Sequence, residues 1–166
     1  MKRSAILAVG VAVALAATTT AAFAVDTADG QIKGGSASVF IGNNEYNDTG
    51  LNQTARARLS PGERVKFRLL VENDGGESGA EYRATGCASN RKFRVTYAAG
   101  GDNVTNEMTD GGFVTEPLDP LEESRLSMTI KAKAASSKGN KRECAVAFTS
   151  EMGGEGDTVA GKATVR

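Results

Sequence analysis

The stretch that decides the fold is ERVKFRLLVE, residues 63–72. Apolar and polar side chains alternate along it, so that the two kinds fall on opposite faces of an extended chain. The apolar face carries Val65, Phe67, Leu69 and Val71, and the polar face carries Lys66, Arg68 and Glu72. This period of two is typical of an antiparallel β-strand with one face in the core and the other in water.

Other parts of the chain alternate in the same way and are separated by turn residues such as Gly, Asn and Asp. We predict strands at residues 36–42, 63–72, 80–86, 92–97, 124–133, 143–151 and 158–165, with a further short strand at 53–58. No segment has a helical face of useful length. Seven or eight short antiparallel strands predict an all-β fold, a sandwich of two sheets.

Two further segments indicate which kind of β-sandwich the sequence predicts. LSPGE (59–63) leads into the strand at 63–72, and LDPLE (118–122) leads into the strand at 124–133. VENDG (71–75) then closes the first of these strands. Pro sets the turn that opens each strand, and Asn and Gly accept the turn geometry at the end.

A Leu-x-Pro turn followed by a strand ending in Val-x-Asn-x-Gly resembles the bacterial immunoglobulin-like modules of the CARDB-like, cell-adhesion-related kind found in exported proteins. The resemblance covers residues 59–75 and 118–132 by motif and the rest by strand count. It implies an immunoglobulin-like antiparallel sandwich with Greek-key connections. It also implies action by contact with a protein or an envelope component.

The N-terminus has the pattern of a secretory signal peptide. Lys2 and Arg3 precede an apolar run at residues 5–17 and a small-residue stretch that ends in Ala22-Phe23-Ala24. The run is shorter than the roughly 20 apolar residues of a membrane anchor. We therefore predict a signal peptide at 1–24, a single domain at 25–166 without a membrane span, and a secreted or envelope-associated location.

Cys87 and Cys144 are the two cysteines of the chain. An oxidising destination favours a disulfide between them, and two free thiols are the alternative. In an immunoglobulin-like sandwich the third strand pairs with the sixth, so the bond would join neighbouring strands within one sheet. Closing a loop of 57 residues contributes at most about 4 kcal/mol.

Composition excludes several classes of function. The chain has 20 basic and 20 acidic residues, and removing Lys2 and Arg3 leaves a mature net charge of about −2. With no basic excess or stripe in evidence, nucleic acid is not expected as a partner. The absence of His excludes imidazole general-base chemistry. We predict no catalytic residues, no cofactor and no metal centre, and a non-catalytic module.

Two alternatives stay open. A carbohydrate-binding module would need exposed aromatic side chains, and Tyr46 and Phe113 are the aromatics expected outside the core. A weak calcium-binding surface would need clustered oxygen ligands. Oxygen-rich stretches occur at residues 43–48 and at Asp102-Asn103 with Asp110, although Asn and Asp also crowd turns for conformational reasons.

Chain direction predicts that the two ends of the sandwich differ in charge. Successive antiparallel strands place the connections 73–79, 98–123 and 151–157 at one end, and these contain acidic residues but no Lys or Arg. The opposite connections, 87–91 and 134–142, contain only basic charges. The residues predicted for an acidic contact or cation site are Asp102, Asp110, Asp119 and Asp157.

Overall fold

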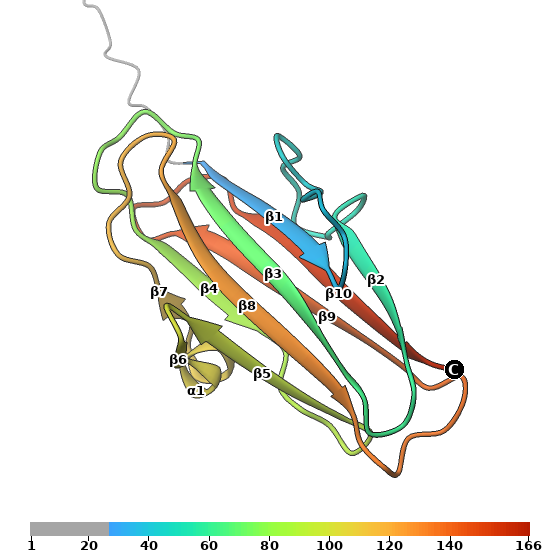
Figure 1. Ribbon diagram of the computed structural model, residues 1–166. Coiled ribbons are helices and arrows are strands. Elements are labelled where there is room, and N and C mark those ends of the chain that lie inside the picture. Colours follow the sequence, from blue (N-terminus) through green and yellow to red (C-terminus); the bar gives the residue numbers. More distant parts are fainter. Residues whose placement is uncertain (1–26) are drawn as a thin grey trace, which may run out of the picture.

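The computed structural model describes residues 27–166 as two packed five-stranded sheets (Figure 1). The predicted signal peptide, residues 1–24, lies outside the described residues. The elements in chain order are β1 Ala28–Gly34, β2 Thr54–Leu59, β3 Arg64–Asn73, β4 Tyr82–Gly86, β5 Phe93–Ala99, β6 Asp102–Asn103, α1 Thr105–Asp110, β7 Phe113–Val114, β8 Glu123–Ala132, β9 Lys141–Ser150 and β10 Asp157–Val165. Within residues 27–166 no helix is long and apolar enough to cross a membrane.

The strand order confirms the immunoglobulin-like sandwich. One sheet has the order β1-β3-β8-β5-β6 and the other the order β2-β10-β9-β4-β7. Immunoglobulin domains place strands A, B, E and D in one sheet and C, F and G in the other, which corresponds here to β1-β3-β8-β5 and β4-β9-β10. The edge strand β2 runs parallel to β10, whereas the other pairs are antiparallel.

The core lies between the two sheets and consists of the inward-facing residues of the alternating strands. Its largest fully buried side chains include five aromatic ones, Phe67, Tyr82, Phe93, Tyr97 and Phe148. Fully burying a side chain of this size contributes on the order of 1.5–3 kcal/mol. The apolar side chains of residues 63–72 therefore point into the core as predicted. They are Val65, Phe67, Leu69 and Val71, and all four are buried.

The prediction of a strand at 36–42 is wrong, because the first strand is β1, residues 28–34. Of the predicted segment only Ile41 pairs, through an isolated bridge to Ile32. Two inward positions of β1 are glycines that the core requires: a Cβ on Gly30 would lie 2.8 Å from the Phe148 ring, and one on Gly34 would lie 2.8 Å from the Phe67 ring. A strand with so little apolar side chain gives no alternation signal.

The connection 98–123 contains two short strands and a helix that the sequence did not predict. β6 turns back along β5, α1 crosses the edge of the sandwich, and β7 pairs with β4 of the other sheet. Six residues are too few for α1 to show a helical period, although Met108 in it is buried. Because β6 and β7 add an even number of strands, the later loops keep the ends predicted from chain direction.

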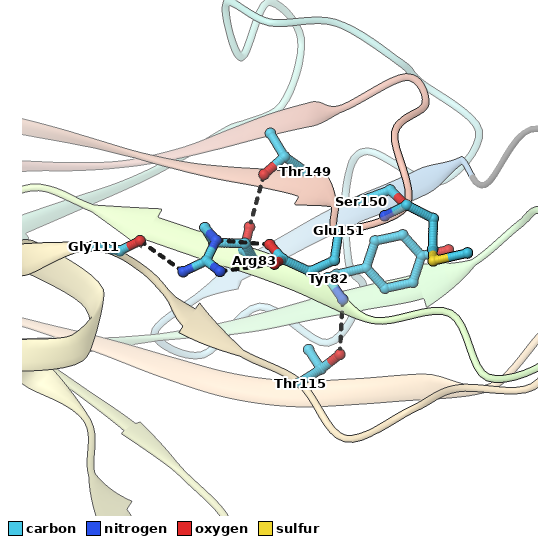
Figure 2. A network of polar contacts seen from close by, with 8 residues as sticks. Tyr82, Arg83, Gly111, Thr115, Thr149, Ser150 and Glu151 are labelled. Carbon is cyan, nitrogen blue, oxygen red and sulfur yellow. Dashed lines mark hydrogen bonds and ion pairs between the residues drawn. The ribbon is translucent and has the colours of Figure 1, made fainter.

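A polar network fixes this crossing segment to the second sheet (Figure 2). The Arg83 guanidinium binds both carboxylate oxygens of Glu151 at 2.7 Å and donates to the carbonyl of Gly111 at 3.0 Å. Nearby, the Tyr82 N–H donates to the Thr115 hydroxyl at 3.1 Å. The ion pair holds the pKa of Glu151 below its usual value. One side chain of β4 thus joins the end of α1 to the connection after β9.

The predicted disulfide is present. Cys87 follows β4 directly and Cys144 lies in the neighbouring strand β9, with 5.5 Å between their Cα atoms. The bond therefore joins adjacent strands of one sheet, as expected. The Tyr97 hydroxyl from the opposite sheet lies 3.0 Å from the Cys144 sulfur and donates to the Cys87 carbonyl at 3.0 Å. Burial raises the pKa of this tyrosine.

Candidate anion-binding face

Basic side chains gather on the outer face of the sheet that contains β3. Because antiparallel partners share a face, its strands form cross-strand rows. One row is Arg64, Lys131 and Arg94; the next is Lys66, Thr129 and Thr96; the third is Lys33, Arg68, Ser127 and Ala98. The six cations of these rows, Lys33, Arg64, Lys66, Arg68, Arg94 and Lys131, are called the basic face below. The three rows contain no acidic residue.

Within the part of the chain that the structure describes, the basic face has no ion-pair partner. In residues 27–166 the four ion pairs join other groups, and none includes a side chain of the basic face. Lys33 lies over the Phe40 ring at 4.3 Å from its centroid. Arg64 and Lys131, and Lys131 and Arg94, are directly opposed. Like charges in that arrangement are destabilising, so the fold bears this cost without a compensating contact.

A shallow groove of about 400 Å³ runs beside the first two rows. Its charged lining is Arg64, Arg94 and Lys131, and its neutral polar lining is Thr96, Asn103, Ser127 and Thr129. The Asn103 Oδ1 atom already accepts from the Thr105 N–H at 3.0 Å and from the Thr105 hydroxyl at 2.6 Å. That pairing leaves the Asn103 Nδ2 group as a donor. The groove thus offers cations and hydrogen-bond donors but no carboxylate.

The other end of the same sheet face is acidic. Asp29, Glu72 and Glu123 form a cross-strand row there. Burial raises the pKa of Glu72, and the charges of Asp74 and Glu123 add to the rise. Four residues of β3 separate Glu72 from Arg68, which is about 13 Å in a strand, and eight separate it from Arg64, which is about 26 Å. Both distances exceed the screening length of about 10 Å at ordinary salt, so the acidic row does not neutralise the basic face.

Unlike the basic face, the acidic row has partners in the protein. Arg125 pairs with Glu123 at 2.8 Å. The Gln31 amide donates to Asp29 at 3.0 Å and to Glu72 at 3.4 Å. Asp29 is buried, and burial raises its pKa to about 6, although the Asn44 N–H donates to its Oδ2 atom and lowers it. The Asp29 Oδ1 atom is buried without a hydrogen-bond partner in the described residues.

The predicted acidic-site residues lie on different elements of the fold. Asp102 lies in β6, Asp110 ends α1 and Asp119 lies in the turn before β8, all three exposed. Asp157 departs from the expectation of a loop charge, because it is 1% exposed at the start of β10. Its carboxylate accepts four hydrogen bonds, from Gly30 N–H, Asn47 N–H, Gln53 Nε2 and Thr158 N–H.

Asp157 instead anchors the loop between β1 and β2, which crosses it through Asn47 and Gln53. Burial raises its pKa, and the four donors oppose that rise. Within residues 27–166 no group of three or more Asp, Glu, Cys or His side chains is arranged to hold a metal ion. The oxygen-rich stretch at residues 43–48 likewise fastens the loop, since Asn44 and Asn47 donate to Asp29 and Asp157.

The two aromatic side chains expected outside the core are held by their surroundings. Tyr46 is 37% exposed, and its hydroxyl donates to the Asp74 carboxylate. Phe113 in β7 is half-buried and packs against the core. Each therefore pins its own segment to the sandwich.

The basic face was not predicted from the sequence. Its charges come from separate strands, and each strand alone contributes a polar alternation that is ordinary for a solvated face. The outward side chains of residues 63–72, 92–97 and 124–133, taken together, would have indicated a cluster of cations. Combining them requires knowing that these strands are neighbours in the sheet. We predicted no nucleic-acid partner because the sequence shows no basic stripe, and that stays a prediction, although the sheet face does bring six cations together.

Comparisons with known proteins concern the fold alone. The sequence matches no protein-family model and no curated protein. Among solved structures, the chain is similar to the CARDB domain of PF1109 from Pyrococcus furiosus, at 13% identity and a TM-score of 0.34, with 84% of this chain and 96% of that one covered. It is also similar to the CooA pilin subunit from enterotoxigenic Escherichia coli, at 12% identity and a TM-score of 0.42, with 82% and 99% covered.

A third similar structure is the VesB protease of Vibrio cholerae, at 12% identity and a TM-score of 0.39, with 68% of this chain covered. The chain spans 30% of the length of that protease. At these identities and TM-scores the similarities say nothing of activity. The immunoglobulin-like topology rests on the strand pairing of this chain itself.

Proposed function

We propose that this chain is an exported, non-catalytic immunoglobulin-like module of the CARDB-like kind, and that it acts by holding an anionic component of the cell envelope against the basic face. One observation carries the proposal: six cations stand in register on one sheet face, and none has an ion-pair partner in residues 27–166. Fixed charges that the fold does not use are available to a partner.

The mature net charge of about −2 does not oppose this function. Screening at ordinary salt limits each charge to about 10 Å, so a partner at Arg64, Lys131 and Arg94 interacts with these cations and not with the acidic row about 26 Å away. The backbone of a sheet face is already ordered, so the entropy lost on binding is mainly that of the lysine and arginine side chains. Such contacts depend strongly on salt.

The test is co-sedimentation of the secreted protein with cell envelopes of the producing organism at about 50 mM and about 500 mM salt. The variant Arg64→Gln/Arg94→Gln/Lys131→Gln removes three charges from the basic face. A matched control, Arg56→Gln/Arg58→Gln/Lys141→Gln, removes three from the outer face of the other sheet. We expect the wild type and the control to sediment at low salt, and the basic-face variant to stay in solution.

Equal sedimentation of the two variants would contradict the proposal. Digestion of the envelope proteins before mixing separates the sources of the contact. Retention after digestion supports a non-protein envelope component, whereas complete loss identifies an anionic envelope protein as the partner.

A further inference from the structure

The groove beside the basic face suits one kind of anionic group better than others. We infer that it seats a tetrahedral oxyanion, namely a phosphate or sulfate ester group of the envelope component. The inference rests on the proposed function and specifies its ligand.

Three cationic side chains can converge on one point of the groove. Neighbouring strands lie about 4.8 Å apart, so the row Arg64, Lys131 and Arg94 places three cationic side chains across about 10 Å of one sheet face. They border a single groove of about 400 Å³. A long guanidinium or ammonium side chain spans half that width, so all three can approach one anion at the centre of the row. One bound anion would relieve the repulsion between both directly opposed pairs.

The groove also contains uncharged hydrogen-bond donors. Thr129 and Thr96 stand in the next row, directly opposed across β8 and β5, and Asn103 closes the groove from β6. Each supplies a hydrogen-bond donor without a charge. The donors therefore come from four strands and approach the groove from different sides.

The shape of the anion distinguishes a tetrahedral oxyanion from a carboxylate at this groove. A phosphate or sulfate monoester presents three terminal oxygens in a pyramidal arrangement, each a strong acceptor. A carboxylate presents two oxygens in one plane. Donors that converge from four strands match the pyramidal group, because a planar carboxylate would leave part of them without an acceptor. The two arginines can each bind two oxygens in a fork.

The test follows amide resonances of the isotopically labelled protein during titration with inorganic phosphate, sulfate and acetate at matched ionic strength. We expect phosphate and sulfate to shift the resonances of Thr96, Asn103 and Thr129, and acetate to leave them unchanged. Arg94→Gln should weaken phosphate binding about tenfold, because a charge-assisted contact is lost. The matched change Arg56→Gln on the other sheet should leave it unaltered.

The variant Thr129→Val distinguishes a specific anion-binding site from general electrostatic attraction, because it removes one hydrogen-bond donor and keeps the shape and the charge of the groove. A few-fold loss of phosphate affinity is expected, with the fold verified by an unchanged spectrum elsewhere. If acetate binds as well as phosphate and Thr129→Val has no effect, the oxyanion seat is wrong while the basic face and the proposed function stand. If no anion, including polyphosphate and dextran sulfate, binds at low salt, both are wrong. Polyphosphate binding without dextran sulfate binding, or the reverse, identifies phosphate or sulfate as the source.

Discussion

The two ends of the sandwich carry opposite charges and use them differently. At the acidic end, the carboxylates are tied into the protein: Asp157 accepts four hydrogen bonds, and Glu123 pairs with Arg125. At the other end, the basic face has no such partners in residues 27–166. The comparison separates charges that hold the fold together from charges that the fold leaves available. A binding site is expected among the second kind.

The two ends also differ in what braces them. The connections next to the basic face are held by the covalent bond between Cys87 and Cys144. Replacing both residues by Ala should lower the free energy of unfolding by about 4 kcal/mol, because the 57-residue loop is no longer closed in the unfolded chain. Urea unfolding measures this, and the reduced wild type is the control. A loss below about 1 kcal/mol would show that the bond is not the brace of this end.

The brace of the acidic end is the buried carboxylate of Asp157. Asp157→Ala should lower the free energy of unfolding by about 3 kcal/mol, because the N–H groups of Gly30 and Asn47 lose their acceptor, while Gln53 and Thr158 keep only backbone carbonyls as acceptors. Asp119→Ala is the matched control, since Asp119 is exposed in a turn, and it should change the stability by no more than about 0.5 kcal/mol. Similar losses in the two variants would mean that the acidic end does not depend on burial of its carboxylates.

The pH dependence of stability should come from the acidic end. The folded protein raises the pKa of Asp29 from 3.8 to about 6. The folded state therefore holds this proton more tightly than the unfolded state, and stability falls as the pH rises from about 4 to about 6. The distance between the two pKa values sets an upper bound of about 3 kcal/mol.

The variant Asp29→Asn keeps the side chain neutral at every pH, so its stability should fall less over this range. Urea unfolding at pH 4 and pH 7 in both proteins isolates the contribution of Asp29, because Asp157 and Glu72 titrate in each. Parallel pH profiles of variant and wild type would assign the dependence to other groups.

The smallest expected effect lies in the basic face. Arg64→Gln/Arg94→Gln/Lys131→Gln should leave stability unchanged or raise it by a few tenths of a kcal/mol, because two directly opposed pairs of like charges are removed. Thermal unfolding at low and high salt measures this, and the gain should vanish at high salt. A clear loss of stability would show that the fold uses these charges after all.

Local pattern was enough to predict much of the sandwich. The strands β3, β8 and β9 alternate large apolar and polar side chains, and that signal is contained in the segment itself. β1 lacked it because Gly30 and Gly34 stand where the rings of Phe148 and Phe67 leave no room for a Cβ atom. The reason for those glycines lies in other strands, so no window of the sequence around β1 contains it.

Charged loops gave a more mixed result. Chain direction placed the acidic connections 73–79 and 151–157 at one end, and the structure agrees because β6 and β7 add an even number of strands. It could not tell that Asp157 is buried or that Asp102 and Asp110 lie along the edge, since burial depends on which loop covers a residue. Three of the predicted carboxylates are therefore exposed on separate elements, and the fourth is buried.

By itself the sequence determined the sandwich class, the cysteine pairing and the separation of charge between the ends, because strand period and chain direction follow from neighbouring residues. Only the tertiary structure decided where a partner can bind. The row Arg64, Lys131 and Arg94 exists because β3, β8 and β5 pair in one register, and a slip of one residue would turn a strand's cations toward the core. Register joins residues far apart in the chain, and it is fixed by packing of the whole sandwich.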